Sequence, residues 1–249
     1  ERVSGEIDRQ LQGSQIGPRS SDRPDLAADY PLLPSRWRFW QEVMQAVDVS
    51  GTSRQVRNSL RTVQNALTAT ARLPLGHVIP ADFIFGELRQ GLVQSGQLLG
   101  EVDALITGEH AAGDPESAQR SSLLALVFLL SRLDPSRRRD LGLHATPATL
   151  ADLLISDLHS GDGGLRTRIP ALLEGLVGRG KLIAVDGEYR MQTGEGREWN
   201  AQYQAALGRI GGDESRIVPE RETRLKTAVG AVVKDLKLVQ GVSKTPRLL

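Results

Sequence analysis

Side chains with the chemistry to contact a nucleic acid gather between residues 166 and 190. Six of them are candidates for contacts with DNA, namely Arg166, Thr167, Arg168, Arg179, Lys181 and Arg190. The first three stand at the expected start of a helix, where the second helix of a helix-turn-helix meets base edges and phosphates in the major groove. The last three are placed to meet the phosphate backbone, which positions a protein on the duplex. Nearby acidic residues dilute this positive charge: Asp162, Glu174, Asp186 and Glu188.

Two short helices are expected to position these side chains. Thr146 suits the N-cap of the first, because its hydroxyl accepts a hydrogen bond from the first turn, and Pro147 suits the first helical position. A second helix follows the glycine-rich break at 159–164. Its apolar residues recur at three- and four-residue spacing: Leu165, Ile169, Leu172, Leu173 and Leu176. Pro170 restricts the start of this helix to a position near Thr167.

A two-stranded hairpin is predicted directly after the second helix. Gly178 and Gly180 end the helix, because glycine tolerates the left-handed conformation of a helix stop. Two short β runs follow, and Asp186-Gly187 lies between them, which is a strong hairpin signal. Helix, turn, helix and hairpin together predict a winged helix. Residues 135–210 are therefore interpreted as a winged-helix domain with a following helix.

The same stretch also resembles a phosphate-binding loop, between Gly175 and Leu182. A true loop of that kind follows a strand, opens a helix and carries Ser or Thr after its lysine. Here the helix comes first, the strand comes after, and Leu182 follows Lys181. No nucleotide site is predicted at this position.

Composition narrows the class of protein. The chain has 249 residues, of which 39% are hydrophobic and 24% charged, and its formal net charge of +1 gives no global attraction to nucleic acid or membrane. The absence of cysteine excludes disulfides and thiolate metal sites and suits a cytoplasmic protein. The longest apolar run, 123–130, is too short to span a bilayer, so no membrane partner is expected. Because the chain begins at Glu1 and stops in mid-pattern, it is interpreted as part of a longer protein.

The remaining sequence predicts a mainly α fold. Residues 1–33 are interpreted as a short helix and a linker, and residues 34–134 as a helical bundle. In the bundle, Trp37 and Trp40 are expected to anchor the core, and the helix through Leu133 to be the most buried element. The helix after Thr52 is expected to bury one apolar stripe: Val56, Leu60, Val63 and Leu67.

Residues 211–249 are interpreted as a C-terminal linking helix that continues to the end of the chain. Its apolar residues alternate in four- and three-residue steps: Leu225, Val229, Val232, Leu236 and Val239. This heptad-type seam favours docking on another helix.

No catalytic or metal-binding residues are predicted. The four histidines, His77, His110, His144 and His159, lack the close helical pairing of metal sites. Asp152 and Asp157 are interpreted as solubilising, and no serine or threonine has a base at a recognisable spacing. The chain by itself is therefore predicted not to be an enzyme and to hold no cofactor.

The stretch 51–57, Gly-Thr-Ser-Arg-Gln-Val-Arg, resembles the opening of a lid helix in AAA+ ATPases. In that family an arginine of this motif reaches the γ-phosphate of ATP bound by the preceding core domain. Arg54 is the residue that the resemblance assigns to this role. The planar guanidinium group stays charged and matches phosphate oxygens. The resemblance thus implies that the 34–134 bundle is lid-like.

A wider resemblance covers most of the chain in a constant order. The stretches 30–40, 51–61, 74–85, 168–177 and 234–244 resemble the large P-loop ATPase of bacteriophage exclusion (BREX) systems, the BrxC/PglY type. The resemblance implies a region after the nucleotide-binding core, a role in phage defence and a bacterial cytoplasm. It also implies other subunits of the defence complex as partners, and ATP and magnesium for the intact protein. The family's phosphate loop and acidic hydrolysis motif are not in this chain.

Two functions from different classes remain open at this point. In one, the winged helix contacts duplex DNA. In the other, the winged helix and the terminal helix are protein–protein assembly surfaces, with self-association among the options. Winged helices serve both purposes, and the fold alone does not choose between them.

Overall fold

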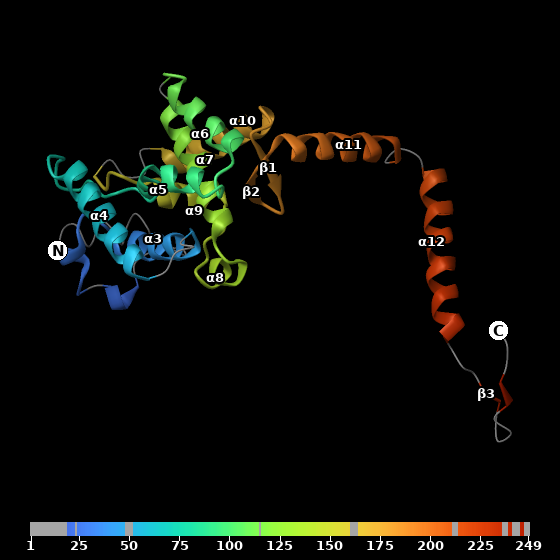
Figure 1. Cartoon of the computed structure of the whole chain (residues 1–249). Helices are drawn as coiled ribbons and strands as arrows, with labels where there is room; N and C mark the ends of the chain where they lie inside the picture. The colour runs from blue at the N-terminus through green and yellow to red at the C-terminus, as the bar shows by residue number, and fades with distance from the viewer. Residues whose placement is uncertain are drawn as a thin grey trace. The chain divides into compact units, whose positions relative to one another are not determined.

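The computed structural model describes residues 19–22, 24–47, 52–114, 116–159, 164–210, 214–235, 239–240 and 245–246 (Figure 1). The fold is mainly α, as the sequence predicts. The chain divides into two compact units, Glu1–Thr193 and Gly194–Leu249. Among the described residues, no helix is both long enough and apolar enough to cross a membrane.

The first unit is a helical bundle that runs into two further helices and a hairpin. Its elements in chain order are η1 (Ser20–Asp22), α2 (Leu26–Asp29), α3 (Pro34–Val47), α4 (Thr52–Thr70), α5 (Phe83–Gln94), α6 (Gly100–Ala111), α7 (Ser117–Arg132), α8 (Pro135–Asp140), α9 (Pro147–Leu154), α10 (Leu165–Gly178), β1 (Leu182–Val185) and β2 (Glu188–Met191).

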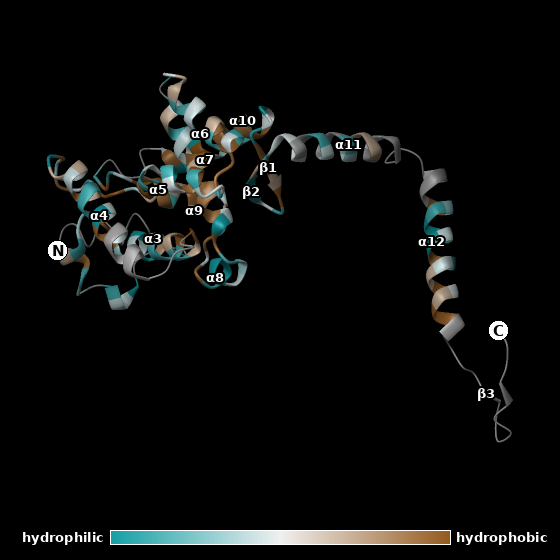
Figure 2. Ribbon diagram, in the orientation of Figure 1, coloured by the Kyte–Doolittle hydropathy of each residue, from teal (hydrophilic) through white to brown (hydrophobic). Residues whose placement is uncertain are grey.

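Helix α7 is the centre of the core. Every residue from Leu123 to Leu130 is buried, and α7 contacts α3, α5, α6, α9, α10 and β2. Figure 2 shows the hydrophobic colouring concentrated on α7 and α9, while α8 is hydrophilic. A helix that is apolar on all sides needs neighbours on all sides, so the predicted burial of this segment is confirmed.

Trp40 anchors the core as predicted, whereas Trp37 is only half-buried. The Trp40 indole N–H donates to the Ala81 carbonyl at 2.9 Å, and its ring stacks on Phe83 with 6.0 Å between centroids. These two contacts satisfy the polar and the apolar parts of a fully buried indole.

The elements predicted between Thr146 and Gln192 are present in their predicted order. The Thr146 hydroxyl accepts from the Thr149 N–H at 3.3 Å, and Pro147 opens α9. The β1–β2 hairpin turns through Asp186 (φ 53°) and Gly187 (φ 79°), with Val185 paired to Glu188. Two consecutive positive φ angles are what a tight hairpin turn requires, and Asp-Gly supplies them at low cost.

Helix α10 begins at Leu165, so the expectation that Pro170 holds its start near Thr167 is wrong. The first turn closes ahead of the proline, because the N–H groups of Thr167 and Arg168 donate to the Gly164 carbonyl at 3.1 and 2.9 Å. Pro170 then removes a single backbone donor. One missing hydrogen bond near the helix start is tolerated.

The bend between Gly175 and Lys181 ends a helix and does not cradle an anion. The N–H groups of Arg179, Gly180 and Lys181 all donate back to carbonyls of α10, at 3.1, 2.9 and 2.9 Å. These donors are the ones a phosphate would need. In this structure the helix end itself uses all three donors.

The second unit contains α11 (Gly194–Ile210), α12 (Glu214–Asp235), β3 (Val239–Gln240) and β4 (Thr245–Pro246). The expectation of a helix that runs to the end of the chain is wrong. Helix α12 ends at Asp235, and Val239 pairs with Pro246 in a short antiparallel hairpin. Valine fits a strand as well as a helix, and Gly241 is a poor helix former, so the heptad spacing alone overestimated the helix. Leu236 lies outside the described residues.

Candidate functional site

The six predicted DNA-contact residues lie on α10, on the turn after it and on β2. Arg166, Thr167 and Arg168 are exposed in the first turn of α10, and Arg190 is exposed on β2. Arg179 and Lys181 lie between these two groups. Three of the six, Arg166, Arg179 and Lys181, form ion pairs with acidic residues of the chain, and these ion pairs decide which side chains can meet a ligand.

Arg166 forms an ion pair with Asp152 of α9. The Asp152 side chain is only 3% exposed, whereas that of Arg166 is 38% exposed. A buried carboxylate without a partner is costly, so this arginine has a structural role in holding α10 against α9. A phosphate at Arg166 would have to compete with that carboxylate.

Arg179 and Lys181 converge on Glu109 of α6. The Arg179 Nη1 atom lies 3.3 Å from Glu109 Oε1, and Lys181 Nζ donates to the same oxygen. Arg120 of α7 binds the other oxygen, with 2.5 Å between Nε and Oε2. Burial would raise the pKa of Glu109, but hydrogen bonds from Lys181 and Arg120 outweigh burial and lower it. This charge cluster fastens the end of α10 to α6 and α7.

A second buried charge ties the bundle to α9. Arg36 of α3 is 1% exposed and donates to the carbonyls of Asp152, Leu153 and Ile155 at the end of α9. Burial lowers the pKa of Arg36 to about 10, although Asp152 and Asp82 oppose the shift. The guanidinium satisfies helix-terminal carbonyls that would otherwise be buried without donors.

Thr167, Arg168 and Arg190 are the other three predicted contacts, and their side chains are exposed. Arg190 makes no ion pair with any residue in the described part of the chain. Between Asp134 and Thr193 the sequence holds eight basic and eight acidic residues. A neutral region of this kind has no general electrostatic attraction for a duplex.

Arg54 lies in α4, but its side chain is outside the described residues. Its contact with ATP therefore stays a prediction. Among the residues that the structure describes, no group of three or more His, Asp or Glu side chains is placed to hold a metal ion. The Nδ1 atom of His144 lies 2.7 Å from Glu188 Oε1, where a protonated Nδ1 donates to the carboxylate.

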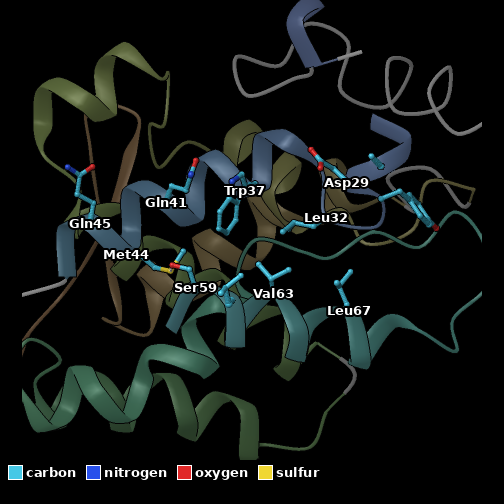
Figure 3. Close-up of a pocket in the computed structure, with 12 residues that line it drawn as sticks. Asp29, Leu32, Trp37, Gln41, Met44, Gln45, Ser59, Val63 and Leu67 are labelled. Atoms are coloured by element: carbon cyan, nitrogen blue, oxygen red, sulfur yellow. The ribbon is translucent and has the colours of Figure 1, made fainter. Parts of the chain in front are cut away.

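A large apolar groove, which sequence reasoning missed, lies between α3 and α4 (Figure 3). Its volume is about 700 Å³. Trp37 and Met44 point into it from α3, and Val63 and Leu67 point into it from α4. Leu32 closes one end. A pocket of this size with mostly apolar walls suits an apolar ligand or a segment of a partner protein.

The groove exists because α4 packs on a face that the sequence did not predict. Leu60 is 67% exposed and Leu67 is 40% exposed, so the expectation that both are buried is wrong. Thr62 and Ala66 are buried in their place, at 3% and 0% exposure. Small side chains bring α4 close to its neighbours and turn the large apolar residues toward the groove. Val63 is half-buried, and the side chain of Val56 is outside the described residues.

Unit two also carries exposed apolar side chains. Leu225, Val229 and Val232 lie on one face of α12 and are 66%, 52% and 64% exposed. On α11, Trp199 and Tyr203 stack with 5.4 Å between ring centroids and stay exposed at 67% and 47%.

Comparisons of the chain with protein-family models, with curated proteins and with solved structures find no match.

Proposed function

We propose that this chain is a non-catalytic helical part of a BREX-type phage-defence ATPase and that it works as an assembly module. The resemblance in residue order supports the family, and the sequence of helices, helix pair and hairpin agrees with a lid-like bundle followed by a winged helix. In this proposal the intact protein binds ATP and magnesium, with Arg54 directed at the γ-phosphate. The winged helix is a rigid support in the bacterial cytoplasm for contacts with other subunits.

The distribution of charge favours assembly over DNA contact. Arg166, Arg179 and Lys181 neutralise Asp152 and Glu109, two carboxylates that are each 3% exposed. Drawing these cations away to a phosphate would weaken the compensation of buried negative charge, leaving Arg120 at Glu109 and Arg36 near Asp152. The exposed apolar surfaces have no such intramolecular function, and large exposed apolar patches mark interaction sites.

The observation that carries the proposal is the apolar seam of α12, which consists of Leu225, Val229 and Val232. Steps of four and three residues place these side chains on one helix face, as in a coiled coil. Burial of apolar surface contributes roughly 25 cal/mol per Å², so pairing of this exposed seam with the seam of a second copy would stabilise a dimer. We assign self-association to α12, which pairs with α12 of a second copy.

The test replaces the seam in the full chain with Leu225→Asn, Val229→Asn and Val232→Asn together. We expect the unsubstituted chain to reach a dimer mass in light scattering as concentration rises, and the triple variant to stay monomeric. Thr223→Asn with Thr227→Asn, on the opposite exposed face of α12, is the matched control and should dimerise normally. A monomer at all concentrations before substitution, or a dimer that survives the triple substitution, rejects the assignment.

DNA contact is the second candidate, favoured by the exposure of Thr167 and Arg168 at the start of α10 and of Arg190 on β2. In a winged helix that binds DNA, the start of the second helix and the wing are the parts that contact the duplex, and these three side chains lie at the start of α10 and on β2. The two candidate functions are distinguished by how binding depends on salt concentration. Binding to duplex through phosphates weakens steeply as salt rises, whereas apolar self-association does not.

A further inference from the structure

A second concave site lies on unit one, between the end of α7, helix α8 and strand β2. Its volume is about 430 Å³. Val102 of α6 and Phe128 of α7 form part of its apolar lining, and Tyr189 and Met191 of β2 line its other side. Of the residues given a functional role above, only Arg190 lines this cleft.

Three arginines line the cleft, and no acidic residue does: Arg132, Arg138 and Arg190. The Arg132 guanidinium lies over the Phe128 ring, 5.4 Å from its centroid. Arg190 is exposed and forms no ion pair within the described residues. Positive charge from three different elements, α7, α8 and β2, therefore converges on one apolar cavity.

Arg138 is the most informative of the three, because its charge is incompletely satisfied. Its Nη2 atom lies 3.6 Å from Glu188 Oε2, beyond hydrogen-bond distance. Its Nε atom is buried and has no hydrogen-bond partner among the described residues. A buried donor without a hydrogen-bond partner is unusual in a folded protein, so the charge of Arg138 is only partly compensated by Glu188.

The arginines and the apolar lining of the cleft together define the class of ligand. The arginines require an anion, and a planar guanidinium matches phosphate oxygens best. Inorganic phosphate alone would leave the apolar lining in contact with water. A flat apolar group attached to the phosphate would cover Phe128 and Tyr189, as bases do on aromatic side chains. The volume falls within the usual range of small-molecule sites.

We propose that this cleft binds a small phosphate monoester that carries an aromatic ring, of which a nucleoside monophosphate is the representative. The phosphate lies against the arginines from α7, α8 and β2. The ring lies on the apolar lining between α7 and β2. The phosphate comes either from a free nucleotide or from a nucleic acid strand, and both sources share this chemistry.

The experiment is calorimetric titration of the full chain with AMP, with adenosine and inorganic phosphate as the two half-ligands. We expect AMP to bind at least tenfold more tightly than either half-ligand, because each lacks one of the two required contacts. Equal affinity for AMP and inorganic phosphate overturns the proposal, as does no binding of AMP at millimolar concentration.

Substitutions then locate the site. Arg190→Gln and Arg132→Gln should each weaken AMP binding at least fivefold. Arg139→Gln is the matched control, since Arg139 is an exposed neighbour that does not line the cleft. Thermal unfolding of Arg190→Gln should be unchanged, which separates lost binding from lost folding. Equal weakening by Arg139→Gln rejects the cleft as the site.

A further titration, with a single-stranded oligonucleotide, identifies the source of the phosphate. A single-stranded oligonucleotide that binds more tightly than AMP, with the same dependence on Arg190, assigns the site to a nucleic acid strand. Weaker binding of the oligonucleotide than of AMP assigns it to a free nucleotide. Oligonucleotide binding that ignores Arg190 contradicts the proposal for strands.

Discussion

At the scale of single residues, the function of a basic side chain depends on partners that are distant in sequence. The sequence predicts Arg179 and Lys181 as phosphate contacts from their place after a helix. Their partner Glu109 lies 70 and 72 residues away, on α6. No local pattern carries that information. Arg190, in contrast, stays exposed as predicted, because strand alternation is a local property.

Glu109 gives a test of the charge cluster through stability. Glu109→Gln removes the carboxylate that Arg120 and Lys181 share, while Arg120 keeps Asp114 as a partner. We therefore expect a loss of about 1–3 kcal/mol in the free energy of unfolding, measured with urea. Glu174→Gln, on the exposed face of α10, is the control and should change stability by less than about 0.5 kcal/mol. Equal stability of the two variants would contradict the structural role of the cluster.

The same residue predicts a pH dependence. The pKa of Glu109 is lowered below its ordinary value of 4.5. A carboxyl with a lower pKa in the folded chain stabilises the fold above its unfolded pKa, and this stability is lost as pH falls through the folded pKa. We therefore expect the difference in free energy of unfolding between the unsubstituted chain and Glu109→Gln to have its full value near pH 7. This difference should shrink below about pH 4.5. A difference in stability that increases as the pH is lowered would contradict this prediction.

The DNA alternative also makes a prediction at this scale. Arg168→Gln with Arg190→Gln should weaken binding to random duplex by roughly 1–3 kcal/mol if the contacts are to bases, or flatten the salt dependence if they are to phosphates. Fluorescence anisotropy at several salt concentrations measures both quantities. Arg139→Gln serves as the control for the change in charge. If the unsubstituted chain fails to bind duplex even at low salt, the DNA candidate is excluded.

At the scale of elements, turn and cap chemistry predicted more than apolar spacing did. Thr146 and Pro147 fixed the start of α9, and Asp186-Gly187 fixed the hairpin, because few other residues tolerate those backbone conformations. Apolar spacing predicted that α4 exists but not which face it buries. Thr62 and Ala66 contact the core, since small residues allow closer helix packing than the leucines on the adjacent face.

Helix α4 offers a direct test of that packing. Ala66→Leu should cost about 1–3 kcal/mol, because Ala66 is fully buried and the added carbons have no room. Leu60→Ser should cost less than about 0.5 kcal/mol, since Leu60 is 67% exposed. Thermal or urea unfolding measures both. If Leu60→Ser proved the more destabilising substitution, α4 would bury the stripe that its sequence suggests.

At the scale of the whole molecule, the chain has two units with different surfaces. Unit one stabilises itself through the α7 core, the Arg36 contacts to α9 and the Glu109 cluster, and it leaves the α3–α4 groove apolar. Unit two carries the α12 seam, whose hydrophobic colouring toward the end of α12 is visible in Figure 2. The cations fulfil internal roles while apolar side chains remain exposed, and this contrast is the reason to assign the chain to assembly.

Sedimentation equilibrium of the unsubstituted full chain, at low and at high salt, tests this assignment most directly. Apolar pairing through α12 predicts a mass that rises from monomer to dimer with concentration and an association constant that salt does not reduce. A monomer throughout, or a dimer that dissociates as salt increases, would contradict it.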